Sequence, residues 1–427
     1  MKKIFLLTII IGLFSSCSEK NEKFAMNATD YDAYLSENSQ SLKSATEAKE
    51  FWSKRLDADT TGVGDIAPLA SAYTSLFSTT GTIENLKIAE GLTKKGLQIS
   101  ANNKDGFARA LALNYISQHR FKEAKQVLEE SYANVSLKRD TELMLFDVSM
   151  ELGEYEAAKN YLDKVKKPGD YNYLIRLSKW SDYRGDLDAA IKYMEEAKDI
   201  AVASGNNALK IWTYSNLGDY YGHAGRIKDS YTQYLKTLAL QPDNYYVKKQ
   251  LAWMAYAWEN NSKEANRILD SISAHHKIPD YYLLKAEIAA FNDNPSEAKK
   301  YTDQFTEAVE NQPDYGAMYN AYLIEIYAED KPEKALALAE NEISNRATPE
   351  TYHLLAYAQL KAGHKEKALQ TIETHVEGKT YEPMAQFHSA LVYKANGKTE
   401  EAHRLKEELL SAGYELGPVI IKDVKTL

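Results

Sequence analysis

The chain has 427 residues, of which 44% are hydrophobic and 26% are charged, a composition typical of a folded protein rather than a disordered one. Its formal net charge of −9 argues against nucleic-acid binding through a general basic surface, because such a chain repels the phosphate backbone. Twenty glycines and ten prolines are few for this length, and the abundance of Ala, Leu, Lys and Glu favours helices.

The first 17 residues have the organisation of an export signal. Lys2 and Lys3 precede an apolar run, 4–14, that is too short to span a bilayer. The sequence Leu-Phe-Ser-Ser-Cys at 13–17 then resembles the lipobox of bacterial lipoproteins. The resemblance implies removal of a signal peptide, 1–16, and lipidation of Cys17, the only cysteine of the sequence. Two or three acyl chains would anchor the protein firmly to a membrane. The alternative is an ordinary secreted protein with a stray thiol.

Residues 17–30 are polar and lack periodicity, which predicts a flexible tether after the lipid. In Gram-negative lipoproteins a serine directly after the cysteine, here Ser18, resembles the signal for the outer membrane. Glu19 and Glu22 resemble, imperfectly, the acidic tags of surface-exported lipoproteins. We therefore expect a lipid-anchored protein of the cell envelope in the outer membrane, on its periplasmic face or at the cell surface. Residues 31–104 are predicted to form an N-terminal helical cap with one degenerate repeat.

Beyond residue 104 the sequence repeats itself. A small residue, preceded by charged residues and followed one helical turn later by a larger one, recurs at intervals of 32 to 40 residues. These nine anchor positions are Ala124, Ala158, Ala190, Ser230, Ala265, Ala298, Ala335, Ala368 and Ala402. Five residues before each anchor stands a residue type that tolerates positive φ. We predict a sharp turn between two helices at these positions, which are Gly153, Gly185, Gly225, Gly363, Gly397, His119, Asn260, Asp293 and Asp330.

A second small position precedes the anchor by twelve residues in six units, and it would let the paired helices approach closely. It is occupied by Ala112, Ser178, Gly218, Ala286, Ala356 and Ala390. Phe146, Trp253 and Leu323 depart from this pattern, and we expect those three pairs to sit wider or tilted.

Repeats of about 34 residues with these features resemble the tetratricopeptide repeat (TPR). The clearest copy matches the pattern of that repeat at Tyr214, Leu217, Gly218, Tyr221, Gly225, Tyr234 and Pro242. The resemblance implies an all-α, right-handed α-α superhelical solenoid of helix hairpins, with about nine repeats in 105–412. We expect the tail 413–427 to cap it, with Val419–Ile421 folding back over the last pair.

In tetratricopeptide proteins the first helix of each pair lines a concave face. The matching positions of the early units are polar: Arg109, Asp147, Lys179, Asp182, Ser215 and Asp219. Those of the later units are mostly apolar or aromatic and are our candidate groove residues: Asn320, Ile324, Tyr327, His353, Tyr357, Leu360, Phe387 and Leu391. Such a groove suits an extended peptide or a helix, although the same side chains could simply pack between neighbouring units. Only Arg109 fits the Lys/Asn clamp with which some family members capture carboxylates.

No catalytic constellation is evident. The sequence lacks Gly-x-Ser-x-Gly and His-Glu-x-x-His, and the adjacent His275 and His276 would point apart on a helix. We therefore expect no enzyme activity, no cofactor and no metal site. The leading hypothesis is a scaffold that binds a protein or peptide and is held at the membrane by its lipid. The alternative is a glycan-binding lipoprotein of a polysaccharide-uptake system, whose large irregular sugar-binding lobe has no room here. A third possibility, the small lipoproteins of outer-membrane assembly complexes, has fewer repeats.

Overall fold

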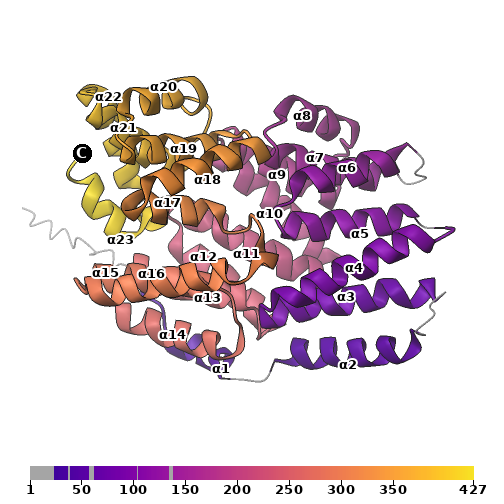
Figure 1. Cartoon of the computed structure of the whole chain (residues 1–427). Coiled ribbons are helices and arrows are strands. Elements are labelled where there is room, and N and C mark those ends of the chain that lie inside the picture. Colours follow the sequence, from indigo (N-terminus) through magenta and orange to yellow (C-terminus); the bar gives the residue numbers. More distant parts are fainter. Residues whose placement is uncertain (1–23, 37–38, 57–61, 103, 134–137) are drawn as a thin grey trace, which may run out of the picture.

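The computed structural model describes residues 24–36, 39–56, 62–102, 104–133 and 138–427. Within these ranges the regular elements are α-helices, α1 to α23, and two short 3-10 turns, η1 and η2, and no strand occurs. Figure 1 shows consecutive helices stacked side by side along the chain. The prediction of an all-α fold is confirmed. The predicted signal peptide 1–16 and Cys17 lie outside the described residues.

The helices pack in consecutive hairpins. Nine hairpins between residues 104 and 411 coincide with the nine predicted repeats, and a tenth lies within 31–104, where one degenerate repeat is predicted. The pairs are α3 (Val63–Thr80) with α4 (Ile83–Ile99), α5 (Lys104–Ser117) with α6 (Phe121–Tyr132), α7 (Lys138–Glu151) with α8 (Tyr155–Lys164), α9 (Tyr171–Tyr183) with α10 (Leu187–Ala203), α11 (Asn207–His223) with α12 (Ile227–Leu240), α13 (Tyr245–Ala257) with α14 (Ser262–His275), α15 (Asp280–Phe291) with α16 (Pro295–Glu310), α17 (Asn320–Asp330) with α18 (Pro332–Asn345), α19 (Pro349–Lys361) with α20 (Lys365–His375), and α21 (Pro383–Ala395) with α22 (Thr399–Ser411).

The anchor residues lie where the two helices of a hairpin meet. Eight of the nine are fully buried, and only Ala298 is half-buried. The small positions on the first helices also serve close packing. A Cβ atom on Gly218 would lie 2.4 Å from the ring of Tyr234, and the hydroxyl of Ser178 donates a 2.7 Å hydrogen bond to the carbonyl oxygen of Ala190. Both contacts require the helices to approach closely.

The predicted turns are present in eight of the nine units. The five glycines have positive φ, and so do His119, Asn260 and Asp293, with φ between 53° and 55°. The prediction for Asp330 is wrong, because this residue is the last of α17 and only Lys331 separates α17 from α18. Pro332 explains the difference, since it begins α18 with a fixed φ and disfavours a helical conformation for Lys331, whose φ of −141° and ψ of 62° end α17.

Many helices begin with a side chain that caps free backbone N–H groups. Asp170, for example, accepts a 2.9 Å hydrogen bond from the backbone of Tyr173, and Thr348 forms a reciprocal capping box with Thr351. Four later helices place proline in their first turn, where the missing N–H has no intrahelical partner to lose. These local signals define the hairpins even where the repeat pattern is degenerate.

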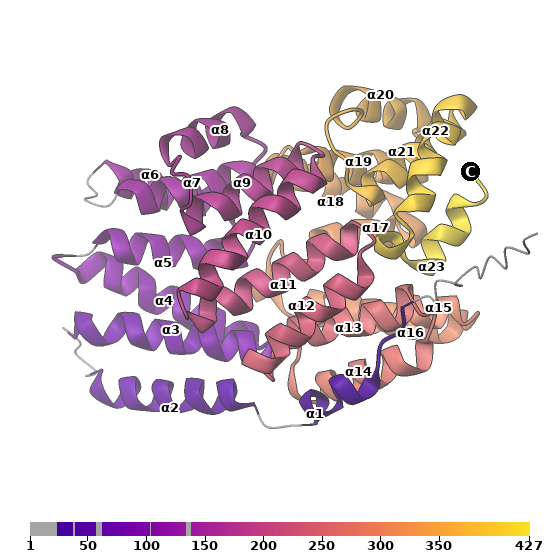
Figure 2. The same ribbon diagram turned by 180° about the vertical axis from the view of Figure 1, so that it is seen from behind.

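The array curves so strongly that early and late hairpins touch, as the two opposite views in Figures 1 and 2 show. The backbone N–H of Lys277, after α14, donates a 2.7 Å hydrogen bond to the carbonyl oxygen of Thr80 at the end of α3. The guanidinium of Arg346, after α18, lies 5.7 Å from the centre of the Phe121 ring on α6. The interior of the superhelix is therefore enclosed by helices from both halves of the chain.

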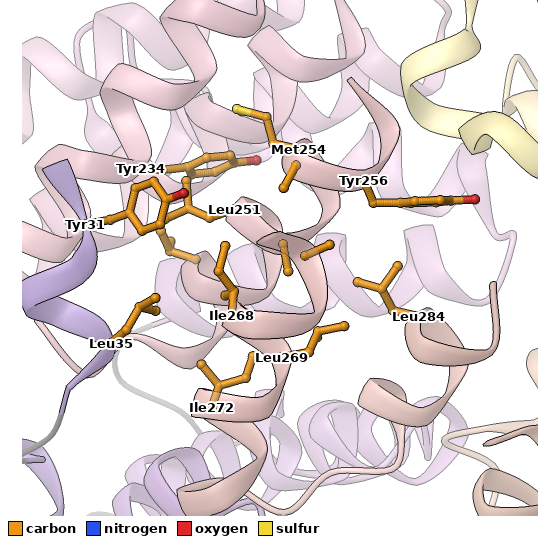
Figure 3. Packing of buried hydrophobic residues seen from close by; sticks show 14 of the residues in the cluster. Tyr31, Leu35, Tyr234, Leu251, Met254, Tyr256, Ile268, Leu269, Ile272 and Leu284 are labelled. Carbon is orange, nitrogen blue, oxygen red and sulfur yellow. The ribbon is translucent and has the colours of Figure 1, made fainter. Parts of the chain in front are cut away.

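Residues 24–30 are not a free tether, which corrects part of the predicted segment 17–30. η1 (Ala28–Asp30) and α1 (Asp32–Leu35) lie against α12, α13 and α14. The indole of Trp258 donates a 2.8 Å hydrogen bond to the carbonyl oxygen of Phe24, and the hydroxyl of Tyr31 donates one of 2.6 Å to Glu264. Figure 3 shows Tyr31 and Leu35 packed beside the buried side chains of α12 to α14. The apolar side chains Phe24, Met26 and Ala28 of this segment, and Tyr31 directly after it, account for the packing.

The N-terminal cap is completed by α2 (Gln40–Arg55), which packs against α3. The carboxylate of Asp243, after α12, accepts hydrogen bonds of 2.6 Å and 2.8 Å from the hydroxyls of Ser39 and Ser41. These bonds join the start of α2 to the middle of the array. None of the described helices combines the length and the apolar character needed to cross a bilayer.

The C-terminal tail is a helix, α23 (Gly413–Val424), bent at Gly417, where φ is +74°. It packs against the last hairpin, as expected, but it also reaches α11, α13 and α15 across the interior. A Cβ atom on Gly417 would lie 3.0 Å from the indole of Trp253, so this close approach requires glycine. The tail therefore fills part of the concave face rather than covering only the end of the array.

Candidate functional site

A large hollow on the described surface lies where the stacking of hairpins is interrupted. Most neighbouring hairpins pack directly, but α16 makes little contact with α17 and is connected to it through η2 (Pro313–Tyr315). The interruption explains why the anchor Ala298 on α16 is only half-buried. It leaves a cleft of about 860 Å³ between α15 and α16 on one side and α17, α19, α21 and α23 on the other. This volume is within the usual range for binding sites.

Apolar and aromatic side chains form much of the cleft. They come from both sides of the interruption and from the C-terminal helix. The apolar and aromatic lining residues are Ala286, Ala290, Ala298, Ile326, Tyr327, Tyr357, Met384, Phe387, Leu391, Val419, Ile420 and Leu427. The cleft thus combines segments that are far apart in the sequence and that only the curved array brings together.

Four of the eight candidate groove residues line this cleft, namely Tyr327, Tyr357, Phe387 and Leu391. The other four do not. The side-chain amide of Asn320 donates a 2.8 Å hydrogen bond to Glu342 inside its own hairpin, where both residues are buried. His353 is buried beside His388, behind the wall of the cleft. Ile324 and Leu360 also pack within the array and do not reach the cleft.

The aromatic wall is held in place by polar contacts at its back. The ring of His388 stacks on that of Tyr357, with centres 4.0 Å apart and planes 2° from parallel. The Nδ1 atoms of His388 and His353 lie 2.9 Å apart, at hydrogen-bond distance. Burial lowers the pKa of His353 to about 3 and holds the pKa of His388 well below its usual range. Both rings are therefore neutral at pH 7, and one can donate to the other.

The tyrosine hydroxyls of the wall are already engaged. Tyr357 donates to the carboxylate of Glu329, which also accepts from Lys361 at 2.8 Å. Tyr327 donates a 2.6 Å hydrogen bond to Glu310. These bonds fix the ring orientations, and because both rings are buried, the tyrosines contribute mainly the apolar backing of the cleft.

Two carboxylates in the cleft lack a cationic partner among the described residues. Glu325, on α17, has only the neutral His388 nearby, with Nε2 3.9 Å from its Oε1. Burial, with a smaller contribution from Glu382, raises the pKa of Glu325 to about 8. Glu287, on α15, accepts a 3.0 Å hydrogen bond from the hydroxyl of Tyr256, yet burial raises its pKa to about 7. Sequence analysis missed both residues, because a glutamate on a helix resembles any solvated charge.

Several concave positions of the early units form ion pairs or hydrogen bonds with neighbouring side chains of the array. Asp147 pairs with Arg176 at 2.5 Å, and Lys179 pairs with Glu151 at 2.8 Å. Arg109 pairs with Asp105 on its own helix at 3.1 Å. Asp219 accepts 2.7 Å hydrogen bonds from the hydroxyls of Tyr234 and Tyr246. Helix α23 lies over this part of the interior, where His223 and Glu415 are 2.9 Å apart.

Across the described ranges, no group of three or more His, Cys, Asp or Glu side chains is placed to hold a metal ion. The paired histidines of the cleft wall are buried behind Tyr357 and touch no serine or cysteine that could act as a nucleophile.

No family model matches the sequence, and no curated protein matches it. Solved structures similar to the chain include yeast Tom70, with 13% identity, 94% of this chain and 96% of that chain covered, and a TM-score of 0.40. A tetratricopeptide repeat protein from Parabacteroides merdae has 17% identity, covers 60% and 97%, and gives 0.34. PilW, a type IV pilus biogenesis factor, has 16% identity, covers 51% and 99%, and gives 0.39. By its own hairpins, anchors and turns, the chain is a tetratricopeptide-like helical-repeat protein.

Proposed function

We propose that this protein is a membrane-anchored scaffold of the bacterial cell envelope that holds a protein partner in the cleft between α16 and α17. The observation that carries the proposal is the interruption of the hairpin stack, which leaves a hollow of about 860 Å³. Aliphatic side chains such as Leu391 and Ile420 are partly exposed in it, and the buried rings of Tyr327, Tyr357 and Phe387 form its backing. Tetratricopeptide-like arrays are suited to holding a segment of another protein, because stacked helices present a rigid, extended surface.

The anchor belongs to the proposal because of the lipobox-like sequence at 13–17. Cys17 precedes Phe24 by seven residues, which span at most about 24 Å when fully extended. Because the backbone of Phe24 is bound to Trp258, a lipid on Cys17 would hold the helical array close to the membrane surface. The carboxyl-terminal half of α13 would then lie near the bilayer.

Site-specific photo-crosslinking in intact cells tests the partner. A photoreactive amino acid replaces Leu391, which lines the cleft, or Glu196 on α10, which is exposed outside it. We expect a discrete protein adduct from position 391 that is missing from position 196. The absence of an adduct, or the same adducts from both positions, would contradict a partner in the cleft.

Membrane attachment is tested separately by fractionating cells that carry Cys17→Ser. This variant should move from the membrane fraction to the soluble fraction, because its acyl chains are lost. Retention in the membrane fraction would refute the lipid anchor and would leave the cleft proposal intact.

A further inference from the structure

Three of the four lysines that line the cleft are engaged with other groups of the chain. The ammonium of Lys299 lies 2.8 Å from Asp303, and that of Lys361 lies 2.7 Å from Glu329. The ammonium of Lys394 donates a 2.7 Å hydrogen bond to the carbonyl oxygen of Thr426. The fourth, Lys331, lies 5.7 Å from the centre of the Tyr327 ring.

Two carboxylates of the cleft, unlike Lys299 and Lys361, have no partner of opposite charge among the described residues. Glu325 and Glu287 stand on the two opposite walls, α17 and α15, and neither has a cation within ion-pair distance among the described residues. The raised pKa of each carboxyl has the same origin, since the enclosed cleft disfavours a charge that no cation compensates. A positive charge brought by a ligand would favour the ionised form of both.

We propose that the segment of the partner that enters the cleft is basic and amphipathic, with Lys or Arg side chains that pair with Glu325 and with Glu287 and an apolar side chain that packs on Phe387 and Leu391. This inference rests on the proposed function of the cleft. It follows from the combination of an apolar wall with two uncompensated carboxylates, which suits a side chain that has an aliphatic stem and a charged end.

Other occupants fit less well. An acidic segment would meet the like charge of Glu325 and Glu287, and three of the four lysines of the cleft are engaged elsewhere. A second copy of this chain has a net charge of −9, so its surface would on average repel the carboxylates of the cleft. An uncharged apolar segment would leave both carboxylates unpaired after the water around them is displaced.

The test is binding of the full chain, solubilised in detergent, to synthetic peptides that share apolar residues but carry Lys and Arg, Glu and Asp, or no charges. We expect the basic peptides to bind best and to lose affinity as salt is added. The double variant Glu325→Gln, Glu287→Gln should weaken the basic peptides by about tenfold or more and reduce the salt dependence. Glutamine keeps the side-chain shape, so the variant should fold, which its thermal unfolding checks.

The control is Glu340→Gln on α18, which removes one charge from an exposed position outside the cleft and should leave binding unchanged. A second variant, Leu391→Ala, removes apolar surface from the wall and should weaken the binding of every peptide that uses the cleft.

Preferential binding of acidic or uncharged peptides, weakened by Leu391→Ala but not by the glutamine variants, would overturn the proposal that the partner segment is basic. The scaffold function would still stand. Failure of all basic peptides to bind, or self-association that Leu391→Ala abolishes, would overturn the inference. Loss of the crosslink at position 391 would be needed to overturn the scaffold function as well.

Discussion

The indole Nε1–H of Trp253 donates a hydrogen bond of 3.0 Å to the carbonyl oxygen of Tyr414 and thereby connects α13 to the C-terminal helix α23. Trp253 occupies the position, twelve residues before the anchor Ala265, that is small in six of the nine units. From the sequence we expected a wider hairpin there. In the structure the large side chain of Trp253 extends across the interior to α23, where it lies against Gly417.

Replacing Trp253 with Phe should therefore loosen α23 rather than the hairpin that contains it. The variant loses one hydrogen bond, worth about 1 kcal/mol, and some of the ring contact at Gly417. Hydrogen exchange measured by mass spectrometry should show faster exchange in Gly413–Val424, with little change in α13 and α14. Trp212→Phe, at an exposed indole on α11, is the matched control. Equal exchange of α23 in both variants would show that the bond does not hold the helix.

The close approach at Gly218 gives a second prediction. In Gly218→Ala the new Cβ would lie 2.4 Å from the ring of the buried Tyr234, so the variant should lose about 1–3 kcal/mol of stability through overpacking. Gly91→Ala, in α4, meets nothing within 4 Å and should gain up to about 1 kcal/mol from the better helix propensity of alanine. Urea unfolding compares the two. A Gly218→Ala variant with the same free energy of unfolding as the wild type would contradict the tight packing at this position.

The hairpins could be predicted from the sequence because their determinants are local. The anchor, the turn residue and the small position recur at fixed offsets in the sequence. The anchor and the small position allow the two helix backbones to approach closely, and the turn residue tolerates positive φ. Departures from the pattern were harder to interpret. Pro332 replaces a turn by a single residue, and Phe24 and Tyr31 turn an apparently loose segment into a packed one. In each case one side chain overrides the pattern around it.

The candidate site could be predicted only in part, because it depends on contacts between distant segments. The repeat offsets predict that Tyr327 and Tyr357 face the interior of the superhelix. They do not reveal that the stacking of hairpins is interrupted after α16. They also do not show that α23 enters the interior. The uncompensated state of Glu325 follows from what surrounds it in three dimensions, and no spacing rule carries that information.

The turn positions give a third prediction, in which one substitution has opposite effects at two sites. Asp293 has a φ of 53°, whereas Asp330 is helical. Asp293→Ala should cost about 0.5–1 kcal/mol, because alanine tolerates positive φ less well than aspartate. Asp330→Ala should be neutral or stabilising, since alanine is the better helix former and an acidic residue at a helix C-terminus is unfavourable. Destabilisation by both variants, measured by urea unfolding, would contradict the difference between the two turns.

A fourth prediction concerns acid stability. Glu90 is buried on α4, and hydrogen bonds from Lys94, Lys87, Gln118 and Arg120 outweigh the effect of burial and lower its pKa to about 2. Because the folded pKa is below the unfolded one, the stabilisation is present above pH 4.5 and is lost as the pH falls towards 2. Glu90→Gln should therefore be destabilised by about 3 kcal/mol at pH 7, and the difference from the wild type should shrink below pH 4.5. Glu50→Gln, at an exposed position of α2, should behave like the wild type throughout.

The opposite pH dependence is expected for Glu325 and provides the last prediction. Its pKa of about 8 in the folded protein lies above the usual value of 4.5. Between these two pH values the folded state therefore holds a proton that the unfolded state has released. Its contribution to stability is therefore complete below pH 4.5 and is lost as the pH rises through 8. Glu325→Gln mimics the protonated form, so it should match the wild type at pH 4 and be more stable than the wild type at pH 9. Thermal unfolding at the two pH values measures the difference. A constant difference at both would mean that a cation compensates this carboxylate in the unliganded protein, and the cleft would then have no unmet negative charge to offer a basic partner.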